Sequence, residues 1–221
     1  MAKKTDQNKP WNKKTTSNRI LLNKIIKKTF RIYCEGQNTE PEYFRAFPIT
    51  TEYKVETIGL GRSKTALVKE VIKREDKIPE KDPDCEIWLV FDKDERGNPK
   101  DNQDFDKSIQ LADKEYFKVA YSNDSFELWF VLHFKYTDAD VLRSEHYDYL
   151  SDMLNCNYEK EGKNKNFSEN LYSKLLEKQP SAIKNAEKLD IFHSNTEKHS
   201  DKKPYTSVHK LVKELNKCIK I

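Results

Sequence analysis

The sequence predicts an α/β fold: a mostly parallel β-sheet flanked by helices and followed by a helical C-terminal extension. Three observations predict it. Short strand-like runs alternate with helix-like segments across residues 29–136. The run CEIWLVF at 85–91 is almost continuously apolar, as expected of a central strand buried on both faces. Beyond Thr137 the remaining periodic segments are helical. Sheets of this kind place function at the carboxyl ends of their strands.

The chain divides into three parts by composition and pattern. Residues 1–28 form a basic N-terminal arm, 29–136 a candidate catalytic core, and 137–221 a helical C-terminal region that we expect to pack on the core. A length of 221 residues suits one such core better than two independent domains.

The first strand is predicted at 29–34, because Phe30, Ile32 and Cys34 alternate with polar neighbours. A helix to about residue 46 follows, with Thr39 as its cap and Glu42 completing a capping box. The later elements are a strand at 54–58, a Gly-Leu-Gly turn and a helix capped by Ser63, the strand at 85–91, a helix at 105–114, a strand at 117–121 and a helix at 125–134.

The C-terminal region is predicted to contain a polar loop at 159–170 and helices at 171–176, 182–189 and 208–219. The last is the clearest, because apolar residues recur on one stripe of the helix. Its stripe consists of Val208, Leu211, Val212, Leu215 and Ile219.

Charge is spread unevenly along the chain. The net charge is +4, but the arm at 1–28 holds nine Lys and Arg against Asp6 alone, which makes it +8 and the remainder −4. A basic arm on a slightly acidic body suggests a polyanion such as nucleic acid as partner. A disordered, solubilising tail explains the same composition.

Several classes of protein and site are disfavoured. The four cysteines lie far apart and form no Cys-x-x-Cys pair, so neither a zinc site nor a disulfide framework is indicated. The chain has neither an apolar run of the ~20 residues that span a bilayer nor a secretory signal pattern. We therefore expect a cytoplasmic protein without a membrane partner.

Three carboxylates lie where predicted strands end. Asp92 and Asp94 follow the apolar strand and face one side wherever the strand alternates, so they could offer hard oxygen ligands to Mg²⁺ or Mn²⁺. Glu35 ends the first strand, which a βαβ connection could place beside the strand of Asp92. Taken singly, an Asp-x-Asp is most often a solvated loop and a Glu-Gly a simple turn.

Four segments together resemble the RloB-like protein family. They are YCEGQNTEPEYF at 33–44, VFDKDE at 90–95, SNDSFELWFVLHF at 122–134 and PYTSVHKLV at 204–212. The resemblance spans residues 29–219. The chain departs from the family pattern at Asp124, where Pro is usual, and at Pro204-Tyr205, where Asn-Pro is usual.

The resemblance implies a Toprim-like domain, as in topoisomerases, primases, a 5S-rRNA maturase and the overcoming-lysogenisation-defect nucleases. In that fold the Glu after the first strand and the Asp-x-Asp pair support Mg²⁺-dependent phosphodiester chemistry, which here points to Glu35, Asp92 and Asp94. It also implies anti-phage defence, with a possible partner protein of a defence system.

Each further candidate site residue has a functional interpretation and a structural one. Glu40 resembles an additional metal-binding Glu but could simply stabilise a helix N-terminus. Glu127 is a candidate catalytic residue or the partner of a capping box. Candidate substrate-binding residues are Arg62, Lys64, His133, Lys163 and Lys165. Core packing of the histidine and solvation of the loop lysines are the alternatives.

We therefore expect a Mg²⁺-dependent nuclease. Two other classes stay open: a non-catalytic nucleic-acid-binding or sensor subunit of a defence complex, and a nucleotide phosphohydrolase. The sequence does not distinguish DNA from RNA as the substrate.

Overall fold

The computed structural model describes residues 26–94 and 99–219, so most of the predicted basic arm at 1–28 lies outside the described residues. The fold is a five-stranded sheet in the order β2-β1-β3-β4-β5. The first four strands are parallel, and β5 pairs antiparallel with β4. The predicted α/β class is confirmed. The strands are β1 Lys28–Cys34, β2 Tyr53–Gly59, β3 Cys85–Asp92, β4 Lys118–Asn123 and β5 Tyr205–Thr206.

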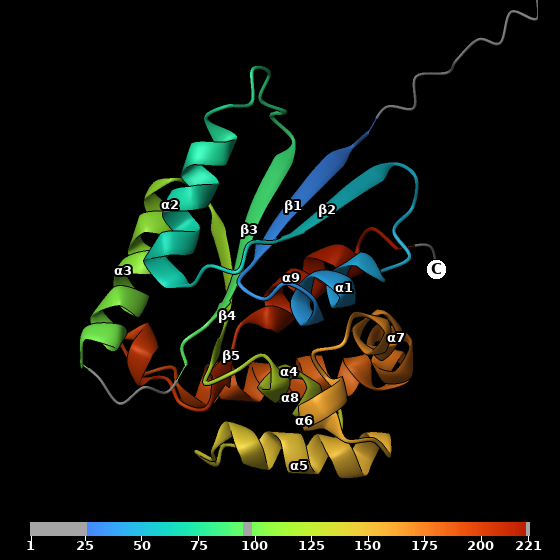
Figure 1. Ribbon diagram of the computed structural model, residues 1–221. Helices are drawn as coiled ribbons and strands as arrows, with labels where there is room; N and C mark the ends of the chain where they lie inside the picture. The colour runs from blue at the N-terminus through green and yellow to red at the C-terminus, as the bar shows by residue number, and fades with distance from the viewer. Residues whose placement is uncertain (1–25, 95–98, 220–221) are drawn as a thin grey trace, which may run out of the picture.

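Helices cover both faces of this sheet. In Figure 1, α2 and α3 lie on one side and α1 and α9 on the other, while α4, α5, α6 and α8 lie beyond the carboxyl ends of the strands. The helices are α1 Thr39–Arg45, α2 Lys64–Glu75, α3 Pro99–Lys114, α4 Glu127–Val131, α5 Arg143–Leu154, α6 Tyr158–Glu161, α7 Lys165–Leu175, α8 Gln179–Phe192 and α9 Val208–Asn216. Short 3₁₀ turns occupy Leu176–Lys178 and His199–Asp201.

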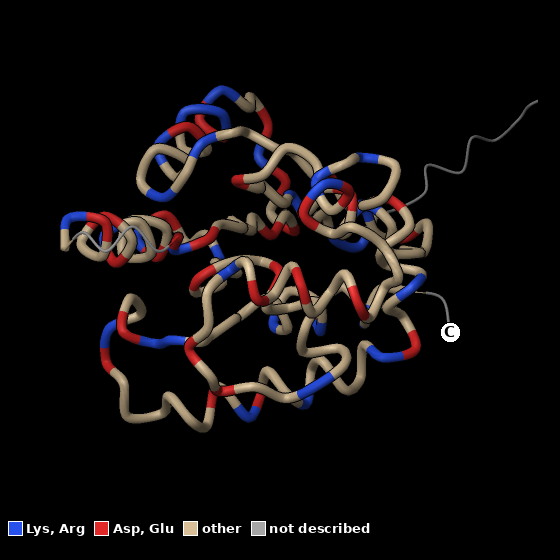
Figure 2. The backbone as a smooth tube through the Cα atoms, turned by 60° about the horizontal axis from the view of Figure 1, so that its bottom comes forward, with Lys and Arg blue, Asp and Glu red and all other residues tan. Residues whose placement is uncertain are grey.

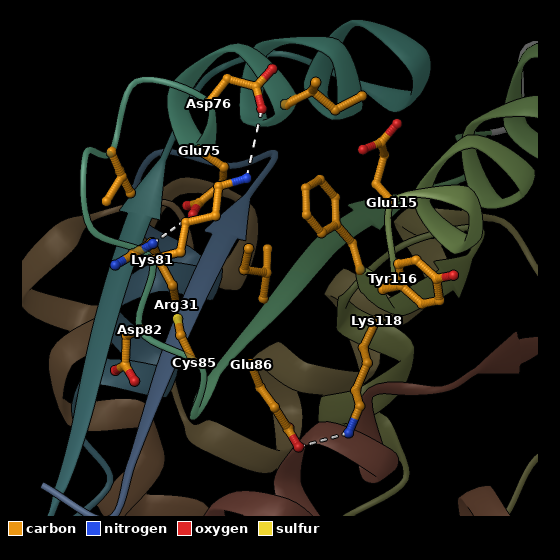
Figure 3. Close-up of a pocket in the computed structure, with 14 residues that line it drawn as sticks. Arg31, Glu75, Asp76, Lys81, Asp82, Cys85, Glu86, Glu115, Tyr116 and Lys118 are labelled. Carbon is orange, nitrogen blue, oxygen red and sulfur yellow. Dashed lines mark hydrogen bonds and ion pairs between the residues drawn. The ribbon is translucent and has the colours of Figure 1, made fainter.

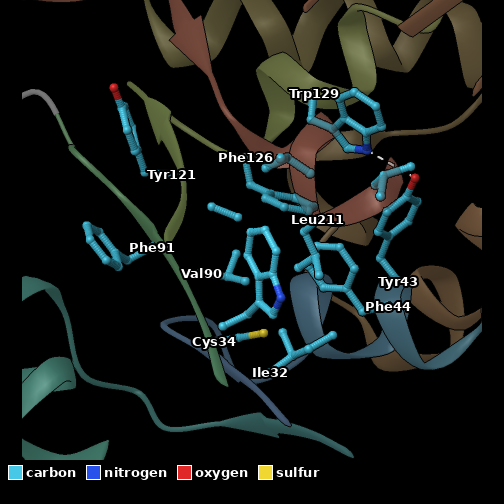
Figure 4. Packing of buried hydrophobic residues seen from close by; sticks show 14 of the residues in the cluster. Ile32, Cys34, Tyr43, Phe44, Val90, Phe91, Tyr121, Phe126, Trp129 and Leu211 are labelled. Carbon is cyan, nitrogen blue, oxygen red and sulfur yellow. Dashed lines mark hydrogen bonds between the residues drawn. The ribbon is translucent and has the colours of Figure 1, made fainter. Parts of the chain in front are cut away.

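Both faces of β3 are buried, which explains its continuous apolar run. Val90 points toward Phe44 of α1 and Leu211 of α9, whereas Phe91 points to the opposite face (Figure 4). There it packs edge-on against Phe105 of α3, with ring centroids 5.7 Å apart. Because side chains alternate along a strand, β3 contributes apolar side chains to two separate layers, one on each face of the sheet.

The predicted capping box at the start of α1 is wrong. Asn38 is the N-cap residue, and it makes no capping hydrogen bond through its side chain. The Thr39 hydroxyl instead donates to the carbonyl of Gly162 at 3.1 Å, and Glu42 pairs with Arg45. These residues tie α1 to its surroundings rather than closing its first turn.

The predicted polar loop at 159–170 is also wrong, because α6 and the first turn of α7 lie there. The inward stripe of α7 begins with Ser168, which is fully buried and donates to the carbonyl of Asn164 at 3.0 Å. A count of apolar residues alone does not detect the start of a helix whose buried stripe begins with serine.

The C-terminal region completes the sheet and its core. As predicted, α9 buries Val208, Leu211, Val212 and Leu215 along one stripe. The helix ends at Asn216 rather than at 219, so Ile219 is not part of this stripe and instead forms an isolated antiparallel bridge with Ile49. The strand β5 adds an edge strand to β4. In the ranges 26–94 and 99–219, no helix has the length and apolar character needed to cross a membrane.

Candidate metal centre

Strand pairing places Glu35 beside Asp92. In the register of β1 and β3, Cys34 lies opposite Val90, and the amide of Glu35 donates to the Val90 carbonyl at 2.8 Å. The amide of Asp92 then donates to Glu35 Oε2 at 3.3 Å. The predicted adjacency of these two strands is confirmed, and the two acidic residues meet at the carboxyl edge of the sheet.

Asp94 reaches the same space from a turn. Its φ of +53° is a left-handed conformation that Asp adopts more readily than most residues. The Asp94 amide donates to the Asp124 carbonyl at 3.2 Å, while Asp92 Oδ2 accepts from the Phe126 amide at 3.1 Å. The loop after β4 thus holds both residues of the Asp-x-Asp pair.

Two helices contribute further carboxylates. Glu40, in the first turn of α1, and Glu127, the first residue of α4, are both buried. Glu40 folds back over Gly36 so closely that a Cβ on this glycine would stand 1.9 Å from Glu40 Oε2. Gly36 is therefore required for the position of the Glu40 carboxylate.

All five carboxylates line one cavity of about 480 Å³. Glu35 follows β1, Asp92 and Asp94 come from the end of β3, and Glu40 and Glu127 come from α1 and α4. Other residues of its wall are Gly36, Gln37, Asn38, Thr39, Gly61, Phe126, Arg143, Tyr147 and Lys163.

Crowding disfavours the charged forms of these groups. Burial and the nearby Asp94 carboxylate raise the pKa of Glu35 to about 7. Burial and Glu127 raise the pKa of Glu40 to about 7, against the opposing effect of backbone amides. Burial, then Glu40, Glu127 and Glu35, raise the pKa of Asp92 well above its ordinary value. Such a set is stabilised by an added cation.

Arg143, the first residue of α5, is a site residue that the sequence did not reveal. Its Nη2 donates to Asp94 Oδ1 at 2.7 Å and lies 3.6 Å from Asp92 Oδ2. Burial works against its charged form, but Asp92, Glu127 and Asp94 raise the pKa of the guanidinium overall. No motif surrounds this arginine, so local sequence offered no signal for it.

Of the predicted substrate-binding residues, Lys163 is brought to the cavity. Asn38 Nδ2 donates to its carbonyl at 3.1 Å, so the start of α1 positions this loop. Lys165 points elsewhere and lies 3.9 Å from Glu42 and 3.8 Å from Glu169.

The other three candidates do not line the cavity. Arg62 is exposed beside α2. Lys64 is buried near enough to Glu35 to oppose the rise of its pKa. His133 is 2% exposed, and its Nδ1 donates to the Trp129 carbonyl at 2.9 Å, which is the core-packing alternative.

The donor set suits a hard divalent cation in its chemistry, because every candidate ligand is a carboxylate oxygen. Within the described ranges, however, no group of three or more His, Cys, Asp and Glu side chains is arranged to hold a metal ion as it stands. Two of the five carboxylates, those of Asp92 and Asp94, lie beside Arg143, and its guanidinium shows that a cation is accommodated between them.

A second cavity, of about 290 Å³, lies near the amino ends of β3 and β4. Its charged side chains already pair with one another: Arg31 with Glu75 at 2.6 Å and Lys118 with Glu86 at 2.9 Å (Figure 3). We therefore place the candidate site in the first cavity, which lies at the carboxyl ends of the parallel strands, where sheets of this kind bind their ligands.

The fold and site define an α/β protein with a carboxylate-lined cavity at the carboxyl ends of a parallel sheet. The sequence profile of the family described as RloB-like protein matches residues 30–215, and the chain belongs to this family. Searches of curated proteins and of solved structures found no match.

Proposed function

We propose that this RloB-like protein is a metal-dependent nuclease with a Toprim-like core, which cleaves phosphodiester bonds at the carboxylate cavity. The observation that carries the proposal is the convergence of five carboxylates from separate elements on one cavity. Repulsion among buried carboxylates is costly unless a cation neutralises them, so a purely structural cluster of this kind is disfavoured.

Each side chain has a proposed part. Glu35, Asp92, Asp94 and Glu40 would hold Mg²⁺ or Mn²⁺ through carboxylate oxygens, and Glu127, which lines the same cavity, would act as a proton acceptor. The bound ion would supply Lewis-acid activation of water and charge stabilisation at the phosphate. Arg143 and Lys163 are the cationic side chains of the wall, and both suit phosphate oxygens.

Recruitment of nucleic acid is assigned to the basic arm at 1–28, which lies mostly outside the described residues. On the described part, Lys and Arg are interspersed with Asp and Glu along the backbone (Figure 2). The arm, with its net charge of +8, would therefore supply electrostatic attraction for the phosphates of a nucleic acid. A role in anti-phage defence rests on the family resemblance.

A non-catalytic binding or sensor subunit is the second candidate. The observation that favours it is the ion pair of Arg143 with Asp94, since an internal cation already neutralises part of the cluster. The two functions differ in whether bonds are cut, so one assay separates them.

The test is incubation of purified protein with plasmid, single-stranded DNA, total RNA and tRNA, each with Mg²⁺, Mn²⁺ or EDTA. Wild-type protein is expected to cut at least one substrate in a metal-dependent way, and Asp92→Asn is expected to be inactive. The matched control Asp76→Asn removes a carboxylate that is 3.9 Å from Lys81, beside the second cavity. It should cut normally. Binding without cleavage in every condition would favour the sensor.

A further inference from the structure

Arg143 occupies the space between two of the proposed metal ligands. Its Nη2 is 2.7 Å from Asp94 Oδ1, 3.6 Å from Asp92 Oδ2 and 3.5 Å from the Asp124 carbonyl. The side chain is 34% exposed and enters the cavity from α5, outside the sheet that carries the two aspartates. A cation shared by Asp92 and Asp94 would stand where this guanidinium lies.

The guanidinium and a divalent cation would each neutralise the negative charge of Asp92 and Asp94. Without a positive partner, crowded carboxylates are destabilising. Arg143 supplies one charge, and a divalent ion supplies two at a closer approach. Both cannot share the position, because like charges a few Å apart repel in a partly buried site.

We infer that Arg143 competes with the divalent cation for Asp92 and Asp94, holding the pair in the metal-free protein and withdrawing when the cation binds. The inference rests on the proposed metal site but adds a property that cleavage does not require. A guanidinium released inside this cavity has five donors and no acceptor, which suits a substrate phosphate. Arg143 thereby acts as a positioning residue for the ligands before it meets a substrate.

The test is titration of metal-free protein with Mn²⁺ by calorimetry. Arg143→Gln removes the competing charge, so its affinity for Mn²⁺ should rise about tenfold or more over wild type. The matched control is Arg74→Gln, since Arg74 pairs with Glu70 at 2.8 Å on α2 and does not line the cavity. Its affinity should equal that of wild type.

Thermal melts give a second readout, independent of cleavage. Without metal, Arg143→Gln should melt below wild type because its carboxylates lose their partner. Saturating Mn²⁺ should close that gap, because the tighter-binding variant gains more stability from the ligand. An arginine that merely docks α5 would leave the gap unchanged.

The outcomes separate this inference from the proposed function. If wild type binds Mn²⁺ and Arg143→Gln binds it equally or more weakly, competition is refuted and the metal site stands. If neither protein binds Mn²⁺ or Mg²⁺, both the inference and the metal site are refuted. Should Arg143→Gln fail to fold, Arg143→Lys and Arg143→Met replace it. The Arg143→Lys variant keeps the positive charge and therefore still competes, so its Mn²⁺ affinity should stay close to that of wild type, whereas Arg143→Met removes the charge and should bind Mn²⁺ more tightly. Equal affinity of Arg143→Met and Arg143→Lys would refute the inference.

Discussion

Neutralising Glu35 should stabilise the metal-free protein at alkaline pH. Its carboxylate lies against Asp92, where Oε2 accepts the Asp92 amide at 3.3 Å, and burial with Asp94 raises its pKa from 4.5 to about 7. Glu35→Gln keeps a carbonyl oxygen that accepts this hydrogen bond and removes the charge.

The size and direction of the effect follow from proton linkage. A carboxyl with a raised folded-state pKa binds protons more tightly in the folded chain. Wild-type stability therefore falls as pH rises from the unfolded pKa of 4.5 through about 7. Between about pH 5 and about pH 8 the shift corresponds to a loss of at most about 2.5 kcal/mol, which the variant escapes.

Urea unfolding at a series of pH values measures this difference. The stability of Glu35→Gln relative to wild type should rise steadily from pH 5 to pH 8, and the variant should lose Mg²⁺-dependent cleavage. The matched control is Glu56→Gln. The pKa of Glu56 is lowered rather than raised, because hydrogen bonds from Lys54 and Arg31 outweigh the effect of burial. The control should gain nothing at alkaline pH. If the difference in free energy of unfolding between wild type and Glu35→Gln does not change with pH, the electrostatic reasoning is refuted.

Three further predictions concern Gly36, His133 and the basic arm. Gly36→Ala places a Cβ against the Glu40 carboxylate, so Mn²⁺ affinity measured by calorimetry should fall at least about tenfold; an unchanged affinity would remove Glu40 from the ligand set. Burial lowers the His133 pKa from 6.5 to about 4, so protonation of the unfolded chain should cost wild type about 2 kcal/mol between about pH 7 and about pH 5. In urea unfolding, the stability of His133→Phe should not fall between about pH 7 and about pH 5. If the stabilities of the two proteins fall in parallel with pH, the prediction is wrong. Changing the Lys and Arg of residues 1–24 to Gln, while keeping Lys27 and Lys28 because they pair with Glu52 and Glu86, should make the salt dependence of log K for duplex DNA shallower by about 0.9 per lost phosphate contact. An unchanged slope would identify the arm as a solubilising tail.

The strands at the site were predictable from local patterns, and the general rule for βαβ connections allowed two of them to lie side by side. Alternation in 29–34 and the apolar run at 85–91 identify two strands, and a βαβ connection favours placing them in parallel. Parallel strands end at the same edge, so the observed pairing of these two strands brings Glu35 and Asp92 together there. Helix boundaries were predicted less accurately. The start of α7 was missed because Ser168 occupies a buried position of the helix, and apolar periodicity does not detect a serine.

By itself, the sequence determined the α/β class and the positions of Glu35, Asp92 and Asp94 at the ends of strands, because strand and helix periods are properties of neighbouring residues. The tertiary structure decided that the first and third strands, which are not consecutive, lie side by side. Only the tertiary structure decided that Arg143 lies between Asp92 and Asp94, and that Lys163 reaches the cavity while His133 does not. Arg143 is 49 residues from Asp94 along the chain. A contact over that separation depends on how α5 packs against the end of the sheet, which no local pattern in the chain encodes.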